Sequence, residues 1–153
     1  MSDSKKWLTV SFAGLSIWII GFVSLPLLGE TMPGSAEFLQ GIYGRTCHQL
    51  PGRSLTINGL PLGVCTRCTA LYAAGWLVLF AGLFRKNIRL LPGIIYVLLS
   101  LPMLTDFFLE KAGVYHDMAP VRLITGFLFG IALFHLFAVS LQPDMAYIAR
   151  KKG

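Results

Sequence analysis

Residues 45–72, RTCHQLPGRSLTINGLPLGVCTRCTALY, are the polar stretch that divides the apolar segments of this 153-residue chain. They contain all three of its cysteines, and long runs of apolar residues lie on both sides of them. Of the whole chain, 55% is hydrophobic and 13% is charged, and its mean hydropathy is +0.68, whereas a soluble domain has about 25% charged residues. The composition therefore predicts an integral membrane protein with one polar loop that carries the cysteines.

Four apolar runs are long enough to cross the hydrocarbon core, which takes about 20 helical residues. They cover approximately residues 7–28, 65–84, 90–109 and 122–141. The predicted fold is all-α, with four transmembrane helices in a single membrane domain over residues 1–153. A long connection rich in Gly, Pro and Ser joins spans one and two, and residues 38–43 within it are expected to form a short helix at the surface.

Basic residues flank these spans unevenly, which predicts an orientation. With a cytoplasmic N-terminus, eight of the thirteen lie inside: Lys5, Lys6, Arg85, Lys86, Arg89, Arg150, Lys151 and Lys152. The other five lie outside: Arg45, Arg53, Arg67, Lys111 and Arg122. The positive-inside rule then predicts a multi-pass protein of the cell (inner) membrane with both termini cytoplasmic and the cysteine loop outside. The basic residues follow the spans and form no soluble basic face, so the expected partner is the lipid bilayer and not nucleic acid.

The cysteines and one histidine have the composition of a zinc site. Cys65 and Cys68 form a C-x-x-C motif where span two begins, and Cys47-His48 lies upstream across a connection rich in Pro and Gly. Residues three apart on a helix share a face, so both sulfurs of the motif point the same way. Two such pairs predict tetrahedral zinc on Cys47, His48, Cys65 and Cys68. Because Cys47 and His48 are adjacent, both can reach one metal only with a strained local backbone, so one of them can instead support a ligand or be a catalytic group. His48 alone can also be a hydrogen-bonded structural histidine.

Other functions remain open for the same cysteines. A C-x-x-C at a helix N-terminus next to Arg67 favours thiolate, which suits a thiol–disulfide oxidoreductase with a quinone as electron acceptor. An outside location also permits a structural disulfide from Cys47 to one partner. A third hypothesis is a small accessory subunit of a membrane complex, in which the site is only structural.

A second group of ionisable residues is predicted at the same membrane face. Asp106 and Glu110 share a face at the end of span three, and Arg122 opens span four. We expect Asp106 to pair with Arg122 or Arg67, either as a structural ion pair or as part of a functional site. Guanidinium groups bind phosphate and carboxylate, so an anionic lipid headgroup or small molecule is a predicted ligand of this group. The predicted residues are Arg45, Arg53, Arg67, Asp106, Glu110 and Arg122.

Two further features concern contacts between the spans. Gly126 and Gly130 form a small-xxx-small pair that lets another helix approach closely, and Ala70 and Ala74 can do the same in span two. His135 lies within an otherwise apolar span, where a packed residue or an interhelical hydrogen bond is a better interpretation than cofactor ligation.

The order of these residues resembles that of a known family. The matching positions are Cys47-His48-Gln49, Pro51, Arg53-Ser54, Gly59, Cys65, Arg67-Cys68, Tyr72, Asp106, Arg122, Thr125 and Gly126. They resemble the pattern of the predicted membrane proteins grouped as domain of unknown function 2085. Departures fall at Ala70, Phe107, Glu110 and Ala119. The resemblance implies that the cysteine motif and the second group belong together, and it implies no particular reaction.

Overall fold

The structure, a computed structural model, describes residues 3–47, 51–85, 88–114 and 118–142. These residues form the helices α1 (Asp3–Thr31), α2 (Pro33–Gly44), α3 (Thr66–Phe84), α4 (Gly93–Lys111) and α5 (Ala119–Ser140). A single 3-10 turn (Pro51–Arg53) and the short strands β1 (Thr56–Ile57) and β2 (Leu60–Pro61) complete the described part. Helices α1, α3, α4 and α5 are long and apolar enough to cross a membrane, which confirms the predicted all-α, four-span fold.

The helix ends differ from the predicted ones by a few residues, and prolines account for two of the differences. Pro92 is the residue before α4, so this helix begins at Gly93 and not near residue 90. Pro120 lies in the first turn of α5, which begins at Ala119 and not at residue 122. Proline suits a helix start because its missing N–H has no intrahelical partner there. Helix α1 extends the first span into the polar segment at Asp3, an acidic residue in the first turn.

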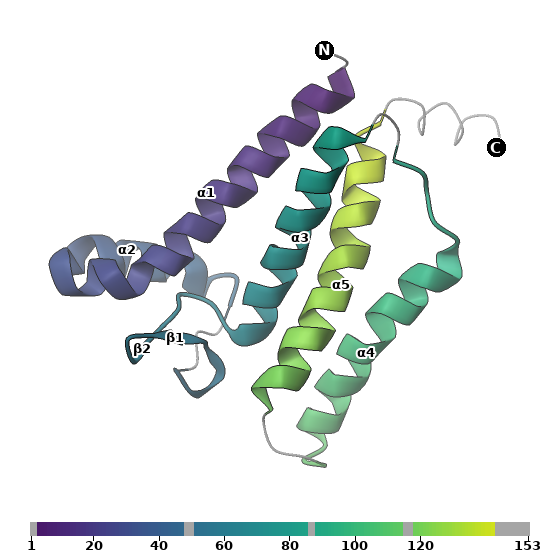
Figure 1. Ribbon diagram of the computed structural model, residues 1–153. Coiled ribbons are helices and arrows are strands. Elements are labelled where there is room, and N and C mark those ends of the chain that lie inside the picture. Colours follow the sequence, from purple (N-terminus) through teal and green to yellow (C-terminus); the bar gives the residue numbers. More distant parts are fainter. Residues whose placement is uncertain (1–2, 48–50, 86–87, 115–117, 143–153) are drawn as a thin grey trace.

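Helices α3 and α5 pack together at the centre of the molecule, with α1 against α3 and α4 against α5 (Figure 1). Helix α2 folds back along the end of α1. The cysteine end of the bundle, where α3 begins and α4 ends, carries the hairpin and α2, and the N-terminus lies at the other end (Figure 1). Asp106 is the buried residue of α4, so most of this helix presents apolar side chains outward, as expected for contact with lipid.

Small residues bring α3 and α5 into backbone contact, as the small-xxx-small pattern predicted. A Cβ atom added at Gly126 would lie 2.5 Å from the carbonyl oxygen of Arg67, and one at Gly130 would lie 2.6 Å from that of Leu71. Ala70 and Ala74 of α3 are fully or almost fully buried. This contact places Arg67 of α3 directly beside the start of α5.

The described parts of the connection between α1 and α3 contact α1. The predicted short helix is present and is longer than expected, since α2 covers Pro33–Gly44. Asn58 and Gly59 both have positive φ and form the tight turn between β1 and β2. The Gly63 N–H then donates to the Phe22 carbonyl at 3.2 Å, which fixes the chain against α1 just before α3 begins.

Candidate metal centre and ion-pair cluster

Three sulfur atoms meet at the cysteine end of the bundle. The Sγ atoms of Cys47, Cys65 and Cys68 all lie within 4.8 Å of one another, close enough to hold one metal ion. A tetrahedral zinc ion with Zn–S bonds of about 2.3 Å needs sulfurs about 3.8 Å apart, so small side-chain movements would complete three corners of the site. All three cysteines are free thiols in this structure.

Each cysteine is positioned by a different local feature. Cys47 follows the end of α2, where its N–H donates to the Tyr43 carbonyl at 2.9 Å, and it is 7% exposed. Cys65 is the residue that caps the N-terminus of α3, and Cys68 lies one turn later on the same face. The Cys65 backbone N–H donates to the Cys47 sulfur at 3.1 Å, which links the two sides of the site. An N–H directed at sulfur stabilises thiolate and is a typical support for a metal ligand.

The surroundings of the sulfurs favour thiolate at Cys65. A hydrogen bond from the Cys68 thiol is the main reason why the pKa of Cys65 is lowered to about 5. Burial of Cys65 raises this pKa, whereas hydrogen bonds from backbone amides and from Cys47 lower it further. Aromatic side chains of α1, α2 and α3 enclose the site, and Tyr43 donates its hydroxyl to the Trp18 carbonyl at 2.9 Å. Burial, with Tyr72 nearby, raises the pKa of Tyr43 above its usual range. A neutral, apolar wall of this kind strengthens charge interactions at the sulfurs.

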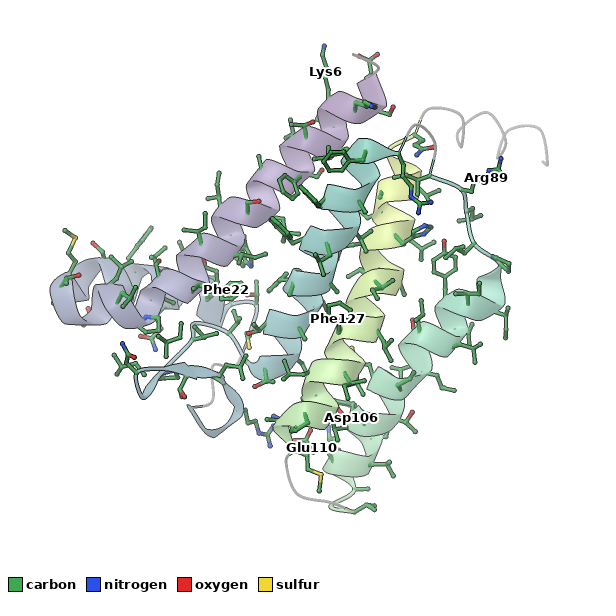
Figure 2. All side chains as sticks on the ribbon, in the orientation of Figure 1. Lys6, Phe22, Arg89, Asp106, Glu110 and Phe127 are labelled. Carbon is green, nitrogen blue, oxygen red and sulfur yellow. The ribbon has the colours of Figure 1, made fainter. Side chains whose placement is uncertain are left out.

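Arg67, between the two cysteines of the C-x-x-C, turns to the opposite side of α3. Its Nε donates to Asp106 Oδ2 at 2.9 Å, and its Nη2 donates to the same oxygen and, at 2.8 Å, to Glu110 Oε2. Asp106 is 4% exposed, so this is a buried ion pair. Arg67, one of the two partners predicted for Asp106, therefore pairs with it. Figure 2 shows Asp106 and Glu110 together at this end of α4.

Two more arginines bind Glu110. Arg122, 4% exposed, donates through Nη2 to Glu110 Oε1, and Arg53 Nη2 lies 3.0 Å from that oxygen. The Arg53 carbonyl accepts a hydrogen bond from the Thr66 hydroxyl at 2.9 Å, which holds the 3-10 turn against the start of α3. We call Arg53, Arg67, Asp106, Glu110 and Arg122 the ion-pair cluster. With both carboxylates ionised, three arginines against two carboxylates leave one formal positive charge.

Two predicted site residues, Arg45 and His48, belong to neither group of contacts in the described part of the chain. Arg45 follows α2, and its side chain is exposed at the cysteine end. His48 lies outside the described residues, so its predicted role as the fourth ligand stays a prediction. Binding of an anion by the arginines also stays a prediction, since the described contacts of Arg53, Arg67 and Arg122 are with carboxylates of the chain itself.

Sequence reasoning missed some residues of these sites. Thr125 is buried with its hydroxyl 3.4 Å from Asp106 Oδ2, and its place in the R-x-x-T-G pattern was the available signal. At the other end of the bundle, the interhelical hydrogen bond predicted for His135 is confirmed, with Tyr96 of α4 as its partner. Arg85 and Arg89, which were used only to predict topology, line a cavity next to His135.

Comparisons with known proteins agree with this description. A family described as "Predicted membrane protein (DUF2085)" matches residues 47–136, which include the cysteines and the ion-pair cluster. An uncharacterised protein of Methanocaldococcus jannaschii is 31% identical over 98 residues, and this match covers 62% of the chain and 63% of that relative. No solved structure matches the chain. Because the family match spans more than half of the sequence, the chain belongs to the DUF2085 family of predicted membrane proteins.

Proposed function

We propose that the protein binds a transition metal ion, zinc, through Cys47, Cys65 and Cys68 at one face of the membrane. The observation that carries the proposal is the convergence of three sulfurs within 4.8 Å, from two segments far apart in the sequence. Thiolates are soft ligands that favour zinc, and the lowered pKa of Cys65 supplies one of them at neutral pH. His48, next to Cys47 in the chain, is our proposed fourth ligand.

The metal centre and the ion-pair cluster flank the first turn of α3 and suggest a joint role. Zinc held by three thiolates and one imidazole has no open coordination position and is usually structural. If one position is instead left open, the zinc ion can act as a Lewis acid on a bound ligand. Arg53 has a side chain that is 46% exposed, and Arg45 is exposed at the same end. We propose that these two arginines, with Arg67 and Arg122 behind them, hold an anionic ligand such as a lipid headgroup. In the orientation that the charge distribution predicts, this face is the outer one.

Metal content together with a free-thiol count tests the metal site on protein purified in a mild detergent. We expect about one zinc per chain, lost in Cys65→Ser and in Cys68→Ser because each removes one of the few ligands. Thr69→Ala, one residue beyond the motif, is the matched control and retains the metal. His48→Gln is expected to weaken zinc binding. Metal-free protein with three titratable thiols, under conditions that keep added zinc available, would contradict the proposal.

A second candidate function, thiol–disulfide exchange, is favoured by the Cys65–Cys68 hydrogen bond and the lowered pKa of Cys65. In that reaction Cys65 and Cys68 form a disulfide, and their two electrons and two protons pass to a quinone, which becomes a quinol. It predicts two oxidised thiols that are reduced at a measurable potential, and quinone reduction that stops in Cys65→Ser. Purified protein with zinc bound and no quinone reduction would exclude this function.

A further inference from the structure

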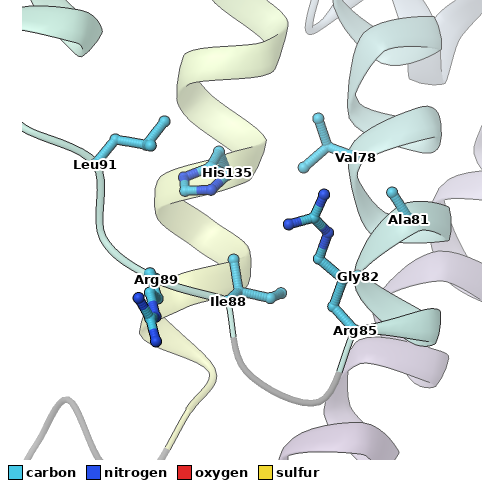
Figure 3. A pocket seen from close by; sticks show the side chains of 8 residues that line it. All are labelled: Val78, Ala81, Gly82, Arg85, Ile88, Arg89, Leu91 and His135. Carbon is cyan, nitrogen blue, oxygen red and sulfur yellow. The ribbon is translucent and has the colours of Figure 1, made fainter.

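A cavity of about 520 Å³ lies at the end of the bundle opposite the cysteines. It opens between α3, α5 and the segment that joins α3 to α4 (Figure 3). One part of its wall is apolar, formed by Val78, Ala81, Ile88 and Leu91. The other part is polar and basic, formed by Arg85, Arg89 and His135. We call this cavity the arginine pocket.

Hydrogen bonds define the polar part of the arginine pocket. The Leu91 backbone N–H donates to the Tyr96 hydroxyl at 3.2 Å, and that hydroxyl lies 2.9 Å from His135 Nδ1. When the Tyr96 hydroxyl donates its proton to Nδ1, a neutral His135 ring carries its own proton on Nε2, where it can act as a hydrogen-bond donor. These bonds join Tyr96 of α4 to His135 of α5 and to the backbone of Leu91.

The charge in the arginine pocket has one sign. Arg85 directly follows α3 and extends its guanidinium toward His135 between α3 and α5 (Figure 3). Arg89 lines the pocket from the connecting segment, and its guanidinium is directed away from the His135 ring (Figure 3). None of the residues that line the pocket in the described part of the chain is acidic. The ion-pair cluster differs here, because Asp106 and Glu110 supply its counter-charges within the chain.

The depth of the arginine pocket matches the headgroup region of a bilayer. His135 precedes the end of α5 at Ser140 by five residues, about 7.5 Å at a rise of about 1.5 Å per residue. Arg85 and Arg89 lie just beyond the end of α3. Basic groups at this level attract anionic headgroups, and basic pockets between transmembrane helices are known binding places for them. The apolar part of the wall would then contact the acyl chains.

We propose that the arginine pocket binds the phosphate headgroup of an anionic membrane lipid in the leaflet at this end of the bundle. Arg85 and Arg89 bind the phosphate oxygens, and His135 donates a further hydrogen bond. Guanidinium groups form paired hydrogen bonds to phosphate oxygens, and the two arginines repel the quaternary ammonium of a zwitterionic headgroup, so an anionic lipid is preferred. This site is separate from the metal centre and does not depend on it.

Native mass spectrometry of the full chain in a neutral detergent tests the proposal. The probes are dioleoyl phosphatidylglycerol, dioleoyl phosphatidylcholine and inorganic phosphate. We expect the wild type to bind phosphatidylglycerol at this site, and the double variant Arg85→Gln/Arg89→Gln to lose one bound lipid whose affinity falls about thirtyfold, while any binding at the cysteine end is unchanged. The double variant Lys5→Gln/Lys6→Gln removes the same charge at the same end, outside the pocket, and should bind within about threefold of the wild type.

Three outcomes would overturn the proposal. Equal affinity for phosphatidylcholine would mean that only acyl chains are bound, and equal losses in both double variants would mean general charge attraction. Inorganic phosphate that displaces the lipid at comparable concentration would assign the pocket to a soluble anion. Helix content and thermal unfolding without lipid show whether each variant folds. If Arg85→Gln/Arg89→Gln does not fold, Arg85→Lys/Arg89→Lys, which keeps the charge and loses the paired hydrogen bonds, must still bind phosphatidylglycerol more weakly than wild type.

Discussion

Both ends of this helix bundle contain arginines, and the two groups differ in where their counter-charges come from. At the cysteine end, Arg67 and Arg122 are largely buried and bind Asp106 and Glu110. At the opposite end, Arg85 and Arg89 line a cavity without an acidic side chain among its described lining residues. Figure 2 shows Asp106 and Glu110 at one end and Arg89 at the other. A buried charge must be paired within the protein, whereas a charge at an open pocket can bind a ligand.

The largest expected effect tests the buried pairing. Asp106→Asn leaves Arg67 partly uncompensated in a buried position, which should reduce the free energy of unfolding by about 3–5 kcal/mol. Thermal unfolding in detergent measures this change. Glu37→Gln, an exposed acidic residue of α2 at the same end, is the matched control and should have little effect. If both variants lose the same small amount of free energy of unfolding, the ion-pair cluster does not stabilise this end of the bundle.

The next prediction concerns the sulfurs beside the cluster. In chelator-treated protein, alkylation of Cys65 should have its pH midpoint near the pKa of about 5, compared with about 8.5 for an unperturbed cysteine. The fold stabilises the thiolate of Cys65, which is the form that the alkylating reagent attacks. Labelling of Cys65 therefore persists at neutral pH and is lost as the pH falls through about 5 and the thiolate is protonated. Cys68→Ala removes the sulfhydryl donor that is the main cause of the shift and should raise the midpoint. Thr69→Ala should leave it unchanged, and a midpoint near 8.5 in the wild type would contradict the assigned hydrogen bond.

A smaller effect tests whether the two ends are independent. Gly126→Ala places a methyl group 2.5 Å from the Arg67 carbonyl oxygen, a backbone atom, so α3 and α5 must separate. We expect a loss of about 1–3 kcal/mol in the free energy of unfolding, with weaker zinc retention and unchanged lipid binding. Gly14→Ala in α1, where an added Cβ meets nothing within 4 Å, is the control and should not destabilise the protein. Loss of lipid binding in Gly126→Ala would show that the ends are coupled.

The smallest effect belongs to the arginine pocket. A double-mutant cycle with Tyr96→Phe and His135→Phe should give a coupling energy of about 0.6 kcal/mol, typical of a hydrogen bond between transmembrane helices. The measurement is unfolding in detergent for the wild type, both single variants and the double variant. A coupling energy of zero would mean that the Tyr96–His135 bond does not organise the pocket.

Much of the fold follows from the sequence because a transmembrane helix is a local property. About 20 apolar residues must form a helix in a bilayer, so four runs predicted four spans with ends correct to a few residues. The i and i+3 spacing of Cys65 and Cys68 predicted a shared face for the same reason. The spacing of Gly126 and Gly130 likewise predicted a close helix contact, although it did not name α3 as the partner.

Other features were decided by the tertiary structure alone. The sequence left open whether Asp106 pairs with Arg122 or Arg67, and the packing of α3 with α5 and of α5 with α4 brings Arg67 to Asp106. The arginine pocket combines residues of α3, α5 and the segment between α3 and α4, so no local pattern indicates it. The sequence by itself determined which segments enter the membrane and which residue types are available, because hydropathy and helical spacing act over short distances. Only the packing of distant helices decided which charges neutralise each other and which remain available to a ligand.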